Sequence, residues 1–227
     1  MSLDMVNKVK KLSLTDEIAA ELRKSILSGK LKPNTRLFEK ELSEQLGVSR
    51  GPLREALRLL EGEGMITSST GRGSFVNSFS ARKVAELYNI RLILEQQAIR
   101  LAASHATDEQ LSQLEQILNA MLQAGHKGQM DKVVELDLQY HEKIWELADH
   151  QLLDQILHGL SAQIRSYMAV HTSLYEDLAA GIENHKLLFN ALKEKNEEAS
   201  AKLMRQHLEE ASDVVTKFAK AQEKQTL

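Results

Sequence analysis

The fold is decided by residues 36–76, which read RLFEKELSEQLGVSRGPLREALRLLEGEGMITSSTGRGSFV. A short helix is predicted over Glu39–Leu46, because the glycine that follows it, Gly47, is the residue type that most often ends a helix. Ser49 is a good N-cap, so a second helix is predicted from there to about Glu63. The segment therefore predicts two helices joined by a tight turn.

The sequence on either side completes a small N-terminal unit. Downstream, β-like stretches at Met65–Ser68 and Ser74–Val76 flank the glycine-rich STGRG, which predicts a hairpin. Upstream, Ser13 and Asp16 form a capping-box-like start for a helix that would end at Gly29. The apolar positions of that helix are Leu14, Ile18, Leu22 and Ile26. The connecting LKPNTRL is expected to be a turn, so the unit consists of three helices and a hairpin.

The composition changes near Ser80. Both prolines and most glycines lie before this residue, and long patterns with the helical period follow it. We therefore predict two domains, residues 1–77 and residues 78–227. The second is expected to contain about six helices: 81–105, 108–125, 129–149, 151–171, 174–195 and 197–222. This pattern predicts a mostly α protein whose C-terminal part is an all-α antiparallel helical bundle.

The composition also excludes several classes of protein. Of the 227 residues, 42% are hydrophobic and 27% are charged, and no apolar run approaches the ~20 residues that a membrane span needs. No apolar segment follows the N-terminal lysines, so we expect no secretion signal, no membrane partner and a cytoplasmic location. The absence of cysteine excludes disulfides, thiolate zinc sites and cysteine nucleophiles.

Charge is divided unevenly along the chain. Residues 1–80 carry 13 Lys and Arg against 10 Asp and Glu, whereas residues 81–227 carry 16 against 22. A basic first part suits a module that faces DNA, although a difference of this size is also ordinary scatter.

The second helix of the decisive segment has an apolar face and a polar face. Its apolar stripe consists of Leu53, Ala56, Leu57 and Leu60. Ser49, Arg50 and Arg54 occupy the N-terminal turns on the other side, which is the end of a recognition helix that enters a major groove. Arginine there can pair with O6 and N7 of guanine, and the alternative is that these are solvated basic residues.

Four polar side chains of the predicted bundle point toward its interior. Asp137 and His141 are four residues apart and share the apolar face of their helix, and His185 and His207 lie on the apolar stripes of theirs. One divalent ion would satisfy all four, whereas hydrogen bonding in the core is the alternative for a single histidine. Nitrogen-rich ligation favours a zinc, nickel, manganese or iron type of ion over calcium or magnesium.

Arg91 is also expected on a buried stripe, so it needs an anionic partner. One alternative is a pair with Glu95 in the same helix. The other is a guanidinium that binds the carboxylate of an effector in the metal cavity. Arg165, beside the stripe of its own helix, is a weaker candidate for the same role.

Residues 36–76 resemble the DNA-binding domain of the GntR family of regulators along their whole length. The shared pattern falls on Gly47–Arg50, Pro52, Arg54–Leu57, Leu60–Glu61, Glu63–Gly64 and Gly73–Val76. The resemblance implies a winged helix-turn-helix whose wing is the hairpin, with DNA contacts from Lys40, Thr70, Gly71 and Arg72. Position 40 most often holds arginine in the family, so lysine there favours a phosphate contact over base reading.

The helical part, over roughly residues 84–215, resembles the FCD effector domain of the FadR subfamily. The matching motifs are Arg91-x-x-Leu94-Glu95, Asp137-x-x-Tyr140-His141, Glu183-Asn184-His185 and His207-Leu208. In metal-binding members an aspartate and three histidines at these positions hold a divalent ion whose open positions face the effector cavity. Tyr140 stands where phenylalanine is more common, a change that touches no ligand.

The sequence thus predicts a ligand-responsive transcription regulator, expected to be a repressor and not an enzyme. It would bind double-stranded operator DNA as a homodimer, because one short recognition helix reads too few base pairs for genomic specificity. The expected effector is a small carboxylate that completes the coordination of the ion. A metal-dependent hydrolase is the alternative, but no H-E-x-x-H motif or nucleophile elbow is present. A purely architectural DNA-binding protein would leave the inward-facing ligands unexplained.

Overall fold

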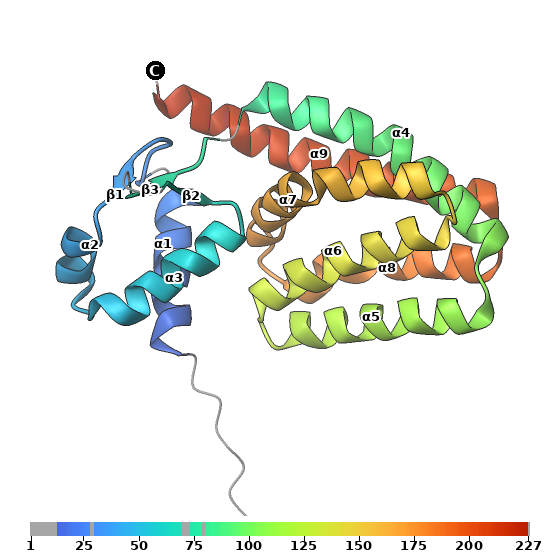
Figure 1. The fold of residues 1–227 in the computed structure, drawn as a ribbon, viewed down its shortest axis with the longest axis horizontal. Helices are drawn as coiled ribbons and strands as arrows, with labels where there is room; N and C mark the ends of the chain where they lie inside the picture. Colours follow the sequence, from blue (N-terminus) through green and yellow to red (C-terminus); the bar gives the residue numbers. More distant parts are fainter. Residues whose placement is uncertain (1–12, 28–29, 70–72, 79, 227) are drawn as a thin grey trace, which may run out of the picture. The chain divides into compact units, whose positions relative to one another are not determined.

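The computed structural model describes residues 13–27, 30–69, 73–78 and 80–226, and it is mostly helical (Figure 1). The chain divides into two compact units. The first comprises residues 1–62 and 66–77, and the second comprises residues 63–65 and 78–227. Each unit is described by itself below.

The first unit is built on three helices, α1 (Leu14–Leu27), α2 (Glu39–Leu46) and α3 (Arg50–Gly62). The predicted capping box starts α1: the Ser13 hydroxyl accepts the Asp16 N–H at 3.2 Å, and the Asp16 carboxylate accepts the Ser13 N–H at 3.0 Å. Gly29, the predicted end of this helix, lies outside the described residues.

The turn between α2 and α3 depends on Gly47. Its φ of 64° is in the left-handed region, where its N–H reaches the carbonyls of Ser43 and Glu44. The helix α3 begins at Arg50, directly after Ser49, and packs against α1. The predicted apolar stripe of α3 is buried, which leaves the opposite face of this helix exposed.

A three-stranded antiparallel sheet completes this unit, in the order β1-β3-β2. The predicted hairpin is present as β2 (Ile66–Ser69) and β3 (Gly73–Val76). The first strand, β1 (Arg36–Leu37), was not predicted, because the end of LKPNTRL was interpreted as turn. Its two residues pair with Phe75 and Ser74 along the other edge of β3, a long-range pairing that no local pattern signals.

The second unit is a bundle of six helices, as predicted. They are α4 (Ala81–His105), α5 (Asp108–His126), α6 (Met130–Leu147), α7 (Gln151–Ser173), α8 (Leu178–Lys193) and α9 (Glu197–Thr226). The predicted start of the fifth helix was too early, because Asp177 caps α8 and its carboxylate accepts the Ala179 N–H at 2.9 Å. The last helix is longer than predicted and continues to Thr226.

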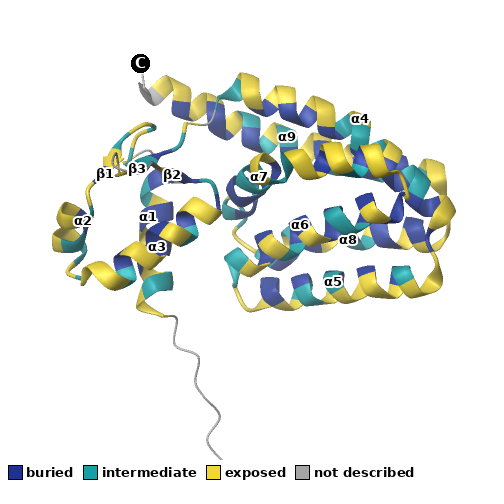
Figure 2. Cartoon of the chain, in the orientation of Figure 1, coloured by how far each residue is buried: buried dark blue, intermediate teal, exposed yellow. Residues whose placement is uncertain are grey.

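The buried faces of these helices form one core (Figure 2). Trp145 is a fully buried member of this core, and α4 packs along α9 over much of its length. Polar side chains also lie in this core, on α4, α6 and α8. In the described part of the chain, no helix is both long and apolar enough to cross a membrane.

Candidate functional site

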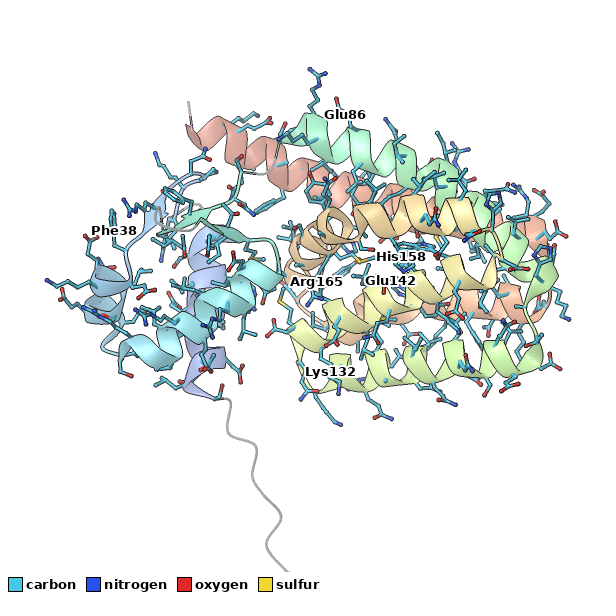
Figure 3. The ribbon with its side chains drawn as sticks, in the orientation of Figure 1. Phe38, Glu86, Lys132, Glu142, His158 and Arg165 are labelled. Carbon is cyan, nitrogen blue, oxygen red and sulfur yellow. The ribbon has the colours of Figure 1, made fainter. Side chains whose placement is uncertain are left out.

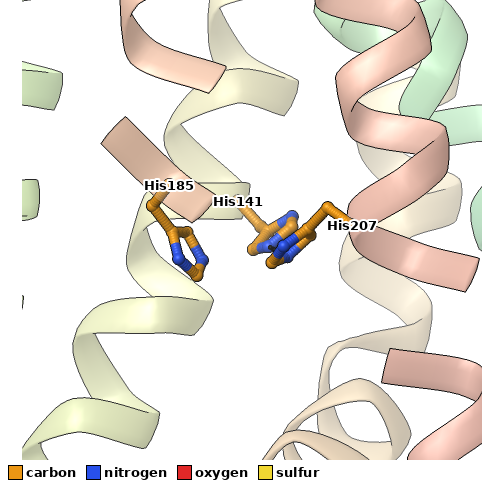
Figure 4. A group of neighbouring side chains, drawn as sticks. All are labelled: His141, His185 and His207. Atoms are coloured by element: carbon orange, nitrogen blue, oxygen red, sulfur yellow. Dashed lines mark hydrogen bonds between the residues drawn. The ribbon is translucent and has the colours of Figure 1, made fainter. Parts of the chain in front are cut away.

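Three histidines from three helices meet inside the bundle. His141 lies on α6, His185 on α8 and His207 on α9, and one ring nitrogen of each lies within 4.8 Å of the others (Figure 4). The Nε2 atoms of His141 and His207 are 3.3 Å apart. His141 and His185 are buried and His207 is half-buried, so their polar atoms converge where water is scarce.

Asp137 joins this cluster from one turn before His141 on α6. Its Oδ1 is 2.8 Å from Nε2 of His185 and 3.6 Å from Nε2 of His141. The structure therefore brings together all four side chains that the sequence predicted as ligands. Burial by itself would raise the pKa of Asp137, but the three imidazoles hold it well below its usual range. Burial and the neighbouring imidazoles lower the pKa of His207, which keeps that ring neutral.

Outer hydrogen bonds fix the orientation of two of the imidazoles. His141 Nδ1 donates to a Glu95 carboxylate oxygen at 2.5 Å, which leaves the lone pair of its Nε2 directed at the cluster. His185 Nδ1 is 3.1 Å from the Ile182 carbonyl oxygen, so its Nε2 is likewise directed inward. Tyr140 donates its hydroxyl to the His185 carbonyl oxygen at 3.1 Å. Histidines that bind a metal through one ring nitrogen usually make a hydrogen bond through the other ring nitrogen, as these two do.

Glu95 is the centre of a buried network, of which the sequence suggested only the pair with Arg91. Besides His141, its carboxylate accepts Arg91 Nε at 2.6 Å and Trp145 Nε1 at 3.2 Å. Burial alone would raise the pKa of Glu95, but Arg91 and His141 lower it to about 2, so the carboxylate is charged. One side chain thus contacts both the predicted effector arginine and a predicted metal ligand.

The donor set fits a divalent ion. Two donors bound to one ion at about 2.0–2.2 Å lie about 3–4 Å apart, and the contacts of 2.8, 3.3 and 3.6 Å in this cluster are close to that separation. Three imidazole nitrogens and one carboxylate oxygen suit a transition metal or zinc. Asp137, His141, His185 and His207 are therefore the residues of this chain that could hold such an ion.

A cavity adjoins the cluster. Its wall contains Asp137, His185 and His207 from the cluster, together with Tyr88, Arg91, His171, Thr172, Tyr175 and mostly apolar neighbours. The Tyr88 hydroxyl and Arg91 Nη2 are buried and have no hydrogen-bond partner among the described residues. Burial raises the pKa of Tyr88 to about 12, so this hydroxyl remains a donor. Two donors without partners thus belong to the wall of a cavity beside a candidate metal site.

The two arginines proposed for the effector differ in position. Arg91 pairs with Glu95 through Nε, which is the first of the two alternatives drawn from the sequence, and its Nη2 is buried without a hydrogen-bond partner among the described residues. Arg165 lies on α7 and is not among the residues that line the cavity (Figure 3).

Two other residues of the cavity wall, His171 and Tyr175, were not predicted from the sequence. Their only signal is a spacing of four residues at the end of a helix, and Nε2 of His171 is 3.2 Å from the Tyr175 hydroxyl.

Four of the side chains proposed to bind DNA belong to the described residues, and all four are exposed. Lys40 on α2 is exposed, as are Ser49, Arg50 and Arg54 at the start of α3. Arg54 Nε donates to Glu39 at 2.8 Å, and the arginine side chain is still 58% exposed. The three wing positions, 70–72, lie outside the described residues. The described basic side chains are therefore placed where a major groove could reach them.

Each of the two units matches a known protein family. The family described as "Bacterial regulatory proteins, gntR family" matches residues 14–76, and the FCD domain matches residues 86–210. The HTH-type transcriptional repressor RspR of Escherichia coli (strain K12) is 36% identical over 205 residues, which are 89% of each chain. The uncharacterized HTH-type transcriptional regulator YdhC of Bacillus subtilis (strain 168) is 32% identical over 181 residues, 79% of this chain and 81% of YdhC.

A solved structure gives the same result. The structure of E. coli McbR/YncC matches with a TM-score of 0.60 and 27% sequence identity, over 91% of this chain and 99% of that one. RspR and YdhC are named HTH-type transcriptional regulators, and McbR of Escherichia coli (strain K12) has the same description. The chain therefore belongs to the GntR family of transcriptional regulators, and its helical domain is an FCD domain.

Proposed function

We propose that this regulator is a homodimeric repressor whose binding to operator DNA is controlled by a small carboxylate held at a metal site in the FCD domain. The observation that carries the proposal is the position of Arg91. Its unpartnered Nη2 belongs to the same cavity wall as Asp137, His185 and His207. The term repressor is supported by RspR, which is named a transcriptional repressor.

The four-residue cluster is proposed to hold one divalent ion of the zinc, nickel, manganese or iron type. When bound, the ion would act as a Lewis acid that attracts an anionic oxygen. Asp137, His141, His185 and His207 would supply its protein ligands. Glu95 and the Ile182 carbonyl would hold two of the rings with their Nε2 lone pairs inward.

The charge of the site supports an anionic effector. Arg91 carries one positive charge, Glu95 and Asp137 carry two negative charges, and histidines bind metals as neutral imidazoles. A divalent ion therefore changes the sum of the local charges from −1 to +1, which a single carboxylate would neutralise. Arg91 Nη2 and the Tyr88 hydroxyl would donate to that carboxylate. The lining favours Arg91 over Arg165 as the effector arginine.

For DNA, we propose that α3 enters the major groove, where Arg50 and Arg54 read bases and Ser49 supports the approach. Lys40 would contact phosphate, and the wing residues Thr70, Gly71 and Arg72 would bind the adjoining DNA by analogy with the family. Two such units related by a two-fold axis would read a symmetric operator. Effector binding would change operator affinity to the extent that the effector prefers one arrangement of the dimer.

Calorimetric titration of small organic acids tests the effector site. The wild type would be compared with His185→Ala, Arg91→Ala and Tyr88→Phe, with Arg165→Ala as the control from outside the cavity. We expect the best acid to lose at least about tenfold in affinity for His185→Ala and Arg91→Ala, a smaller amount for Tyr88→Phe, and nothing for Arg165→Ala. Tyr88→Phe removes one hydroxyl and leaves the Arg91–Glu95 pair intact, so the test does not depend on a fragile variant.

Gel shifts with operator fragments selected from random duplexes then connect the site to DNA. The acid is expected to change operator affinity of the wild type and not of His185→Ala. Equal binding of the acid to His185→Ala and wild type would contradict the metal-anchored effector site.

A further inference from the structure

An exposed arginine of the first unit is held by two aromatic rings. The guanidinium carbon of Arg36, on β1, is 4.7 Å from the ring centre of Phe38 and 5.9 Å from that of Phe75. Phe38 directly precedes α2, and Phe75 lies on β3. Both distances are within the range of a cation–π interaction. We call these three side chains the Arg36 clamp.

The pairing of the strands places the clamp on the outer face of the sheet. Arg36 is the direct cross-strand partner of Phe75, so their side chains project to the same face. The next residue, Leu37, projects to the opposite face and is buried, whereas Arg36 is exposed. Phe38 (Figure 3) is 45% exposed, so packing in the core of the unit does not account for a phenylalanine at this position.

The rings take the place of an ion pair. Among the described residues, the Arg36 side chain has no carboxylate partner and no hydrogen bond, whereas Arg54 on α3 pairs with Glu39 at 2.8 Å. A guanidinium has its N–H donors at its edge, and stacking on rings uses only its flat faces. The clamp therefore fixes a positive charge at the surface while its donors remain available to a ligand.

The clamp lies beside the elements proposed to bind DNA. A Cβ built on Gly73 would be 3.3 Å from Nε and 3.5 Å from Nη2 of Arg36, so the guanidinium lies against the backbone at the start of β3. Gly73 directly follows the wing positions 70–72 in the sequence. Phe38 is two residues before Lys40, which is proposed to contact phosphate. The clamp is thus placed between the start of the wing strand β3 and the start of α2.

The geometry favours a phosphate over a base as the ligand. To read a base edge inside a groove, Arg36 would have to extend away from the sheet and lose its contacts with both rings. A phosphate oxygen lies on the outside of the duplex and accepts the N–H groups at the edge of a guanidinium. Stacking also restricts the side chain before DNA binds, so less rotamer entropy is lost on binding.

We propose that Arg36, held in place by Phe38 and Phe75, is a further DNA-binding residue that donates to a phosphate of the DNA backbone. Such a contact adds affinity for any duplex and helps to position the first unit on it, without reading the sequence. This inference rests on the proposed binding of operator DNA and adds one residue to that interface.

Gel shifts of the full-length protein test the contact with two probes, a duplex selected from random sequences and an unselected duplex of equal length. Arg36→Gln is expected to weaken binding of both duplexes by about tenfold at about 0.1 M salt, and to reduce the salt slope by about 1, because one phosphate contact is lost. Lys24→Gln is the matched control, because Lys24 is an exposed cation on α1 of the same unit. This control is expected to change neither affinity nor salt slope appreciably.

The role of the ring is tested by a variant that keeps every charge. Phe38→Leu removes the aromatic face and retains an apolar side chain, so it is expected to lower affinity for both duplexes about two- to fivefold with an unchanged salt slope. The double variant Arg36→Gln/Phe38→Leu is expected to bind like Arg36→Gln alone, because Phe38 acts through Arg36. Thermal unfolding of each variant shows whether the first unit is still folded.

The outcomes separate this contact from DNA binding itself. A wild type that binds neither duplex would overturn the proposed function together with the contact. A wild type that binds, with Arg36→Gln indistinguishable from Lys24→Gln, would overturn the contact alone. A loss in Arg36→Gln that is confined to the selected duplex would overturn the assignment to phosphate. Additive losses in the double variant would overturn the role of the Phe38 ring.

Discussion

Replacing Glu95 with glutamine is expected to weaken both the fold of the bundle and its affinity for a metal ion. The glutamate accepts hydrogen bonds from Arg91, His141 and Trp145 at 2.6, 2.5 and 3.2 Å. Glutamine keeps the shape but has one acceptor oxygen, and its amide N–H groups would meet donors. The change also removes the carboxylate that pairs directly with the buried charge of Arg91.

The magnitude follows from these contacts. Breaking a buried ion pair by removing one partner costs about 3–5 kcal/mol in the free energy of unfolding. Loss of the hydrogen bond that orients His141 is expected to weaken metal binding by about 10–100-fold. Urea unfolding of the metal-free protein measures the first effect, and competition against a chromophoric chelator measures the second.

The matched control is Glu209→Gln. Glu209 accepts Arg205 Nε at 2.8 Å with the same spacing of four residues, but both side chains are about half exposed or more. An exposed pair of this kind contributes about 0–1 kcal/mol, so the control is expected to change neither stability nor metal affinity appreciably. A Glu95→Gln protein that unfolds and binds metal like Glu209→Gln would refute the role assigned to this network.

Three further results are expected. Arg54→Ala should cost about 1–3 kcal/mol of operator binding and relax base preference, whereas Lys40→Ala should weaken all sequences evenly and reduce the salt slope by about 1, as salt-controlled gel shifts can show. Chelation should lower the melting temperature of the wild type and leave that of Asp137→Ala unchanged, since only the wild type would have lost a bound ion. Burial lowers the pKa of His171 to about 4, so the unfolded chain binds its proton first as the pH falls. Stability of the metal-free protein should therefore fall from pH 6.5 to pH 4, and His171→Gln should make this loss smaller, with the remainder coming from His207, whose pKa is also lowered; an equal slope in both proteins would contradict it.

The parts of the fold that could be predicted are those with local signals. The capping box at Ser13 and Asp16 and the left-handed glycine at position 47 each involve residues only a few positions apart, so the sequence alone predicts these helix ends. The helical period of the apolar residues predicts the six helices of the bundle. The strand β1 could not be predicted in this way, because its two residues are a strand only through pairing with β3.

The residues of the candidate site also divide into those with a local signal in the sequence and those that depend on long-range contacts. Inward-facing polar residues on apolar stripes identified Asp137 and the three histidines, because periodicity determines which face of a helix is buried. The role of Glu95 depends on contacts with residues 46 and 50 positions away, and no spacing within one helix reveals them. The cavity residues Tyr88 and His171 were missed for the same reason, since a cavity exists only once the helices are packed.

The most direct test of the account is the metal content of the full-length protein purified without chelators. Elemental analysis is expected to find about one divalent transition-metal or zinc ion per chain in the wild type and much less in His185→Ala, and circular dichroism of the metal-free forms should show that both are folded. A wild-type protein that holds no such ion, and takes up none when zinc, nickel, manganese or iron is added, would contradict the metal site and the effector mechanism built on it.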